Sequence, residues 1–270
     1  MKLSFATLGC PAWNLEKIAA EAARMGFEGV ELRGQPGEHI GMTETPESRR
    51  AIRELFKKHG VAIAAIMGYT HFTGSDDGAW RKQIENTVAM AQLAHDVGCP
   101  VLRVFGGKLE AGAREAGVAR VAAGLREVGA AVEPMGVKIA LETHDDWCEG
   151  RFLAEVLAQV NHPAIGACWD VGNTFFYEPA ETTWKAIGRY VSHVHFKDAA
   201  QEEKDVRGTL LGEGQVDLRK ALRLLRDGRY TGYLSFEWEK KWQPGLAEPE
   251  IAFPHYVSFV RSLMKEEGVS

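Results

Sequence analysis

The stretch Met25-Gly-Phe-Glu-Gly-Val-Glu-Leu32 decides the fold class of this chain of 270 residues. Glycine 26 separates a helix-forming segment, Glu16 to Met25, from an apolar, β-branched run. A glycine that ends a helix and leads directly into a strand is the junction that alternating α/β folds repeat. The stretch His59-Gly-Val-Ala-Ile-Ala-Ala-Ile66 has the same pattern. The sequence therefore predicts a helix-then-strand unit that recurs along the chain.

The same alternation extends through the rest of the sequence. Further helical segments that stop before a glycine are expected at Pro46–His59, Trp80–Val97 and Ala113–Met135. Short apolar strands are expected to begin near eight positions: Lys2, Glu28, Val61, Pro100, Val137, Ala164, Val191 and Gly232. Strands that alternate with helices favour a parallel α/β sheet with right-handed crossovers. Eight such units close naturally into a (β/α)₈ TIM barrel, with a doubly wound open sheet as the structural alternative.

No linker, low-complexity tract or charge block divides the chain, so we expect a single TIM-barrel domain over residues 1–270. Three long loops follow predicted strands: Gly34–Thr45, Tyr69–Ala79 and Ala199–Val216. Loops of this kind build the active sites of barrels, and the last is long enough to act as a lid.

The composition excludes several classes of partner. Hydrophobic residues make up 45% and charged residues 26% of the chain, and the net charge is −5, which argues against a nucleic-acid partner. No stretch approaches the roughly 20 apolar residues of a membrane span. The four cysteines form no Cys-x-x-Cys pair, which favours free thiols and a cytoplasmic protein over a structural zinc knuckle.

Four polar residues each end a different apolar run: Glu142, Asp170, His195 and Glu237. In a parallel sheet the carboxyl ends of the strands meet on one face, where α/β folds place their chemistry. A single glutamate at a strand end is usually a solvated surface residue, but four such residues on strands five to eight favour a shared site. Three carboxylates and one imidazole have the composition of a divalent metal site, suited to Mn²⁺ or Mg²⁺, with Co²⁺ or Zn²⁺ as alternatives.

Side chains along these strands strengthen that interpretation. Alternate residues of a barrel strand point inward, so His193, His195 and Lys197 share one face, as do Glu237 and Glu239. Unpaired buried charges are costly, and a cluster rich in carboxylates therefore needs a counter-ion. A bound cation would supply it.

Several motifs resemble the xylose isomerase-like TIM barrels, the sugar phosphate isomerase/epimerase group. They extend over nearly the whole chain: Ala19–Leu32, Leu141-Glu-Thr-His144, Cys168-Trp-Asp-Val-Gly-Asn173, His193-Val-His-Phe-Lys-Asp198, Leu211-Gly-Glu-Gly214 and Ser235-Phe-Glu237. These motifs are specific for the superfamily and only weakly specific for the substrate.

The resemblance implies a divalent-metal-dependent isomerase or epimerase of a ketose, aldose or related polyol. It assigns the metal to Glu142, Asp170, His195 and Glu237, with Mn²⁺ the first expectation. It makes Glu142 and Glu237 the catalytic acid/base pair that exchanges a substrate proton through an ene-diolate stabilised by the ion. A homodimer or homotetramer is also implied.

Two alternatives to that function stay open. A dehydratase of a cyclic keto-polyol such as an inosose would use the same ion and the same proton abstraction, and then expel a hydroxyl as water. A non-catalytic sugar- or metal-binding barrel has no need of two glutamates on opposite sides of a substrate.

One position departs from the family pattern. Many relatives carry a histidine three residues after the strand-six aspartate, and this chain has Asn173 there. An amide can hydrogen-bond a hydroxyl but cannot titrate near neutral pH. Together with the lack of an Asp-x-His pair after strand seven, Asn173 argues against the three-zinc DNA-repair endonucleases that share this barrel.

Six residues near predicted strand ends are candidates for binding the substrate: Trp13, His71, His144, Asn173, Lys197 and Arg207. His144 could instead orient Glu142 or be an ordinary loop histidine. Lys197 could instead form a salt bridge with Asp198 or Asp170, and Arg207 could be a solvated cation of the lid-like loop.

Weaker candidates lie on the first four units of the barrel. Trp13 could pack on the apolar face of a sugar or anchor the start of a helix, and His71 could line the pocket. Glu31 is expected to end strand two and point into the site mouth, with an ion pair to Arg33 or Arg103 as the alternative. The glycines at 106 and 107 with the following lysine are a weak phosphate-binding signal.

Overall fold

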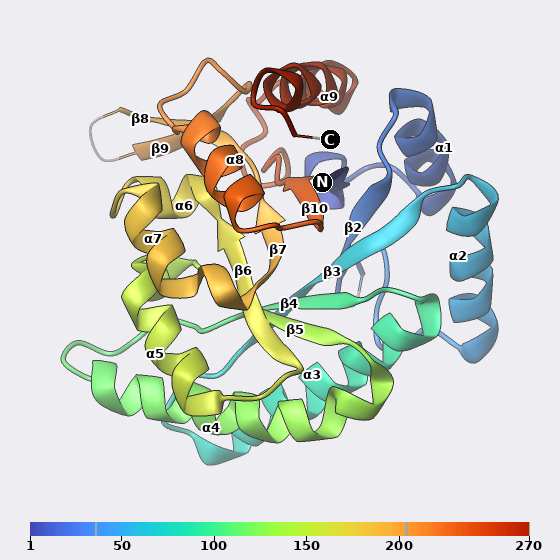
Figure 1. Ribbon diagram of the computed structural model, residues 1–270. Coiled ribbons are helices and arrows are strands. Elements are labelled where there is room, and N and C mark those ends of the chain that lie inside the picture. Colours follow the sequence, from blue (N-terminus) through green and yellow to red (C-terminus); the bar gives the residue numbers. More distant parts are fainter. Residues whose placement is uncertain (36, 203–204, 270) are drawn as a thin grey trace.

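The computed structural model describes residues 1–35, 37–202 and 205–269, and it contains a closed barrel of parallel strands (Figure 1). The ring order is β1-β10-β7-β6-β5-β4-β3-β2. Its strands have these bounds: β1 Lys2–Ala6, β2 Gly29–Gly34, β3 Ala62–His71, β4 Val101–Phe105, β5 Lys138–Glu142, β6 Ile165–Asp170, β7 Val191–His195 and β10 Tyr233–Phe236. The predicted (β/α)₈ barrel is confirmed, and the open-sheet alternative is wrong because β1 pairs with β10 and closes the ring.

Helices surround the barrel (Figure 1). They have these bounds: α1 Leu15–Met25, α2 Pro46–Lys58, α3 Asp77–Val97, α4 Arg114–Val132, α5 Gly150–Val160, α6 Val171–Phe175, α7 Ala180–Ile187, α8 Leu218–Asp227 and α9 Pro249–Glu266. Gly26 and Gly98 end α1 and α3 in the left-handed conformation, at φ 83° and 77°, which confirms the predicted junction. The expected helix to Met135 stops earlier because Pro134 lacks the N–H that would continue it, and a 3₁₀ turn, Glu133–Met135, follows.

Two of the predicted loops are more regular than expected. Strand β3 extends to His71, so the loop that follows is shorter than Tyr69–Ala79. The lid-like segment contains an antiparallel hairpin of β8, Asp198–Glu202, and β9, Asp205–Thr209. Residues 203–204 of that segment and residue 36 of the loop Gly34–Thr45 lie outside the described residues.

The buried carboxylate of Asp198 holds the base of this hairpin. It accepts hydrogen bonds from the backbone N–H groups of Ala199, Gly212, Gly214 and Val216 at 2.8–3.1 Å. A Cβ at position 214 would collide with this carboxylate, which explains the glycine there. The carboxylate of Asp198 therefore fixes the position of the hairpin next to β7, the strand that carries His195.

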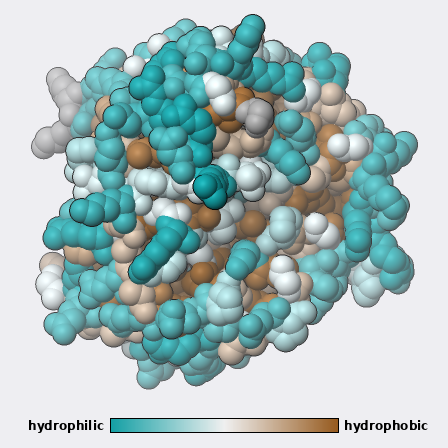
Figure 2. All heavy atoms as spheres, viewed as in Figure 1, coloured by the Kyte–Doolittle hydropathy of each residue, from teal (hydrophilic) through white to brown (hydrophobic). Residues whose placement is uncertain are grey.

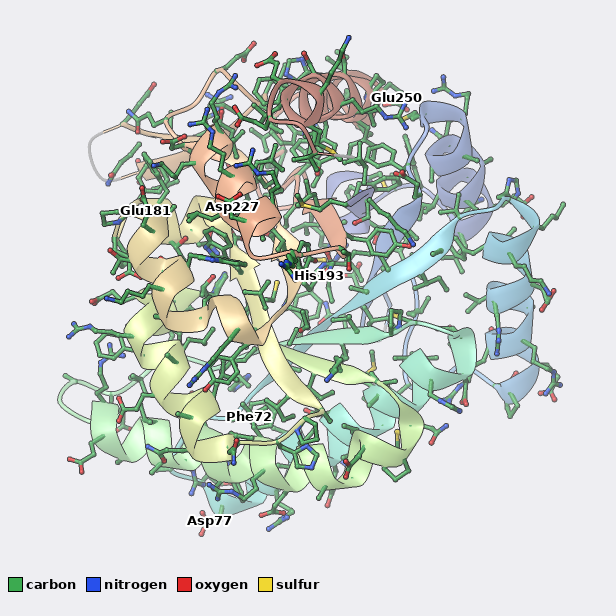
Figure 3. All side chains as sticks on the ribbon, in the orientation of Figure 1. Phe72, Asp77, Glu181, His193, Asp227 and Glu250 are labelled. Carbon is green, nitrogen blue, oxygen red and sulfur yellow. The ribbon has the colours of Figure 1, made fainter. Side chains whose placement is uncertain are left out.

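The barrel interior is unusually polar for a protein core. Glu31, Arg33, Arg103 and His193 are all buried inside the ring, and Figure 3 shows His193 near its middle. Buried charges are stable only when they are paired. Apolar residues instead fill the layer between the strands and the helices, and hydrophilic side chains cover most of the face in Figure 2. Among the described residues, no helix is long and apolar enough to span a membrane.

Candidate metal centre

Four neighbouring strands of the ring bring one imidazole and three carboxylates together. Strands β5, β6, β7 and β10 lie side by side, and the β6–β7 register places Asp170 directly beside His195. Nδ1 of His195 lies 3.2 Å from Glu142 Oε1, 3.5 Å from Asp170 Oδ2 and 3.4 Å from Glu237 Oε1. One donor atom from each of these residues lies within 4.8 Å of the others, so the structure brings the predicted metal ligands together.

This arrangement fits a divalent cation better than a hydrogen-bond cluster. Nδ1 carries at most one proton and cannot donate to three carboxylates. Donor atoms bound to one ion at about 2.0–2.2 Å lie roughly 3.0–3.5 Å apart, which matches the spacing around Nδ1. Burial raises the pKa of Asp170 although Lys197 opposes the shift, as expected for a carboxylate short of positive charge.

Glu31 orients His195 from the opposite side. Its Oε1 lies 3.1 Å from Nε2 of His195, and its Oε2 contacts Nε2 of His193 at 3.0 Å and the hydroxyl of Ser235 at 2.7 Å. In the neutral imidazole, which is the form that binds a metal, a proton on Nε2 of His195 would be donated to Glu31, and the Nδ1 lone pair would face the three carboxylates. Histidines that bind metals are commonly held this way by a carboxylate on the other ring nitrogen.

The sequence did not reveal this role of Glu31. The residue lies in the middle of β2 rather than at its end, and it pairs with the two histidines of β7 instead of Arg33 or Arg103. The signal available in the sequence was the spacing of His193 and His195, which places both rings on the inner face of one strand.

Local structure fixes the carboxylate of Asp170. Its Oδ1 accepts the backbone N–H of Asn173 at 2.8 Å and caps the N-terminus of α6. Oδ2 therefore points toward His195 and the other carboxylates. The amide of Asn173 donates to the carbonyl of Thr143 at 3.3 Å, which places this side chain beside the ligand cluster.

Glu142 and Glu237 are both ionised in this environment. Burial opposes ionisation of Glu142, but the guanidinium of Arg103, with Nε at 3.1 Å, and His195 lower its pKa below the usual range. Burial also opposes ionisation of Glu237, but the positive charges of protonated His195 and of Lys197 outweigh burial in the metal-free protein and lower its pKa below the usual range. Both side chains are therefore proton acceptors near neutral pH.

Lys197 is held by three carboxylates. Its Nζ lies 2.9 Å from Asp170 Oδ2, 2.6 Å from Glu237 Oε2 and 2.8 Å from Glu239 Oε1. Burial lowers its pKa, but these charges outweigh burial and raise the pKa well above its usual value. The ammonium is thus a fixed positive charge at the edge of the cluster, in line with the salt-bridge alternative to substrate binding.

A cavity of about 330 Å³ opens beside the cluster. Its walls include three of the candidate substrate-binding residues, His144, Asn173 and Lys197, together with Glu237. Aromatic side chains that the sequence had not singled out, such as Phe176 and Tyr177, also line it. We refer to this space as the metal-side cavity.

The other three candidates lie elsewhere. His71 lines a separate cavity beside the β3 and β4 ends, and Trp13 packs against Phe253 with ring centroids 5.8 Å apart. Arg207 lies on β9 and donates to the carbonyl of Gly245 at 3.5 Å. Neither Trp13 nor Arg207 is among the residues that line the metal-side cavity.

Comparisons with known proteins agree with this architecture. The model of a family described as xylose isomerase-like TIM barrel matches residues 19–258. Inosose dehydratase of Serratia proteamaculans is 22% identical over 304 residues, covering 100% of this chain and 98% of that protein. Fructoselysine 3-epimerase of Escherichia coli O157:H7 is 22% identical over 289 residues, covering 99% and 100%. The solved structure of IolI with a bound zinc atom has a TM-score of 0.79 at 21% identity and covers 98% and 99%.

Proposed function

We propose that this chain, which belongs to the xylose isomerase-like TIM barrel family, is a divalent-metal-dependent isomerase or epimerase of a ketose, aldose or related polyol. The observation that carries the proposal is the convergence of two ionised glutamates, Glu142 and Glu237, on the same ring nitrogen of His195. Similarity over the whole chain to fructoselysine 3-epimerase supports it.

The residues of the site have two roles, which are binding of the metal ion and transfer of a substrate proton. Glu142, Asp170, His195 and Glu237 would hold the ion, and Mn²⁺ is our first assignment because oxygen donors predominate. When bound, a divalent cation supplies positive charge that stabilises an ene-diolate by several kcal/mol.

Proton transfer is assigned to the two glutamates. They reach the site from β5 and from the residue after β10, two strands that are separated in the ring by β6 and β7. One carboxylate removes the proton α to the substrate carbonyl. The other, which is also ionised in the free site, first takes up a proton from water and then delivers it to the opposite face or the neighbouring carbon. Asn173 and His144 line the metal-side cavity, where they are placed to hydrogen-bond hydroxyl groups of the substrate.

Solvent exchange tests the proposal directly. Candidate ketoses are incubated in D₂O with the Mn²⁺-loaded protein, and deuterium at carbon is followed by NMR and mass spectrometry. We expect exchange that is lost in Glu142→Gln and Glu237→Gln. Glu28→Gln, the same change at an exposed glutamate that does not line the cavity, is the control for general damage. Failure to exchange with any ketose, aldose or polyol would favour a non-catalytic binding barrel.

A dehydratase of a cyclic keto-polyol is the second candidate. Similarity to an inosose dehydratase over the whole chain favours it. It requires the same proton abstraction and then a proton donor for the departing hydroxyl. His144 lies on the cavity wall with Nδ1 3.0 Å from Asp145 Oδ2, so its ring is held in one orientation. A product lighter than the substrate by one water would identify this reaction.

A further inference from the structure

A second cavity, of about 600 Å³, lies beside the metal-side cavity. It is formed by the segments that follow β3 and β4 and by the first turns of α4. Apolar or small residues supply much of its wall: Phe105, Leu109, Ala113, Ala116 and Gly117. None of the roles assigned above to the metal centre uses this space.

The two cavities adjoin. Asp145 lines both of them, and the ring of His144 in the metal-side cavity lies 4.7 Å from the ring of Phe105 in the second. Phe105 also packs under the guanidinium of Arg103 at 4.1 Å, and Arg103 contacts Glu142. Phe105 in the wall of the second cavity is therefore linked to the proposed metal ligand Glu142 through Arg103.

Charges around the second cavity are neutralised or exposed. Arg120 lies 2.8 Å from Asp77, at the outer edge of the molecule in Figure 3, and Asp145 is paired with His144. Lys108 and Glu110 carry opposite charges and are exposed at the margin. The cavity thus offers an apolar group contact with the half-buried side chains of Phe105 and Leu109 but presents no single buried charge that would select an ion.

We propose that the substrate is a sugar or polyol that carries an apolar or aromatic substituent. The polyol end occupies the metal-side cavity, and the substituent lies over Phe105 toward Leu109 and α4. This inference rests on the proposed function. The volumes support it, since the metal-side cavity is at the lower end of the roughly 300–1,000 Å³ of ligand pockets and the second cavity is nearly twice as large.

The test compares fructose with fructose that carries a benzyl group at O1 or at O6. Binding to the wild-type protein is measured by calorimetry, and proton exchange in D₂O is measured with Mn²⁺. We expect at least one benzyl derivative to bind about tenfold more tightly than fructose. Ala116→Trp fills the second cavity and should abolish that preference. Ala119→Trp, the same change at an exposed position of α4 that does not line the cavity, should keep it.

The outcomes separate this inference from the proposed function. A preference of less than twofold in the wild type, or one that survives in Ala116→Trp, would overturn the apolar subsite even if fructose exchanges its protons. A preference that Ala116→Trp removes would support the subsite even if no exchange occurs, because calorimetry does not depend on turnover. If Ala116→Trp does not fold, Ala116→Asp makes the same comparison by placing a charge in the cavity, with Ala119→Asp as its control.

Discussion

Replacing Glu31 with glutamine tests how the metal centre is oriented. The carboxylate contacts Nε2 of His195 at 3.1 Å, Nε2 of His193 at 3.0 Å and the hydroxyl of Ser235 at 2.7 Å. A neutral amide of the same size keeps one acceptor oxygen, and its NH₂ group replaces the other carboxylate oxygen, which faces either His195 or the pair His193 and Ser235. The imidazole of His195 then loses a fixed orientation and a negative charge that raises its basicity.

The loss of such a carboxylate typically costs 10- to 100-fold in metal affinity, or about 1.4–2.7 kcal/mol. We expect the Mn²⁺ dissociation constant of Glu31→Gln, measured by calorimetry, to rise by that factor. Ser235→Ala removes only one of the contacts to Glu31 and should have a smaller effect. Glu28→Gln is the matched control, because this exposed glutamate accepts the backbone N–H of Leu3 at 2.9 Å and belongs to neither group of potential metal ligands among the described residues. A folded Glu31→Gln protein with wild-type Mn²⁺ affinity would refute the orienting role.

Three further predictions concern stability. Asp198→Ala leaves four backbone N–H donors without an acceptor, and a single unsatisfied buried group costs about 1–3 kcal/mol. The free energy of unfolding in urea should therefore fall by about 3 kcal/mol or more. A fall of less than about 1 kcal/mol would contradict the role of Asp198 in holding the hairpin. Hydrogen bonds from Arg223 and Arg219 lower the pKa of Glu267 to about 2, below an unfolded value near 4.3, so this carboxylate stabilises the fold above about pH 4 and progressively less as the pH falls toward 2. The melting temperature of Glu267→Gln should therefore lie below wild type at pH 7 and converge with it near pH 2, and a gap that is independent of pH would exclude this ion pair as the cause. Lys197→Met removes a counter-charge from three carboxylates, so the metal-free variant should have a lower melting temperature than the wild type. Added Mn²⁺ should raise the melting temperature of the variant by more than it raises that of the wild type. Equal increases would contradict this role of Lys197.

The barrel and the ligand set were predictable because each depends on a short local pattern. Glycines 26 and 98 ended helices where the helix-to-strand junction requires a left-handed residue. The predicted strand ends at Glu142, Asp170 and His195 match the structure to the residue, because each closes an apolar run. Parallel strands that end together then bring their last side chains to one place.

The unpredicted features depend on distances that only the closed ring fixes. Glu31 reaches His195 across 164 positions of sequence, and no local pattern in β2 indicates that partner. Trp13 and Arg207 follow predicted strands, but Trp13 packs against Phe253 and Arg207, on β9, contacts the carbonyl of Gly245. The second cavity is likewise formed by separate loops that meet only in the folded chain.

The most direct measurement is the location of Mn²⁺ by anomalous scattering from crystals of the metal-loaded protein. We predict one ion at about 2.0–2.3 Å from Nδ1 of His195 and from a carboxylate oxygen of each of Glu142, Asp170 and Glu237. An ion bound instead by Glu31 and the Nε2 atoms of the two β7 histidines, the other cluster able to hold a cation among the described residues, would contradict the site. So would crystals in which neither position takes up Mn²⁺.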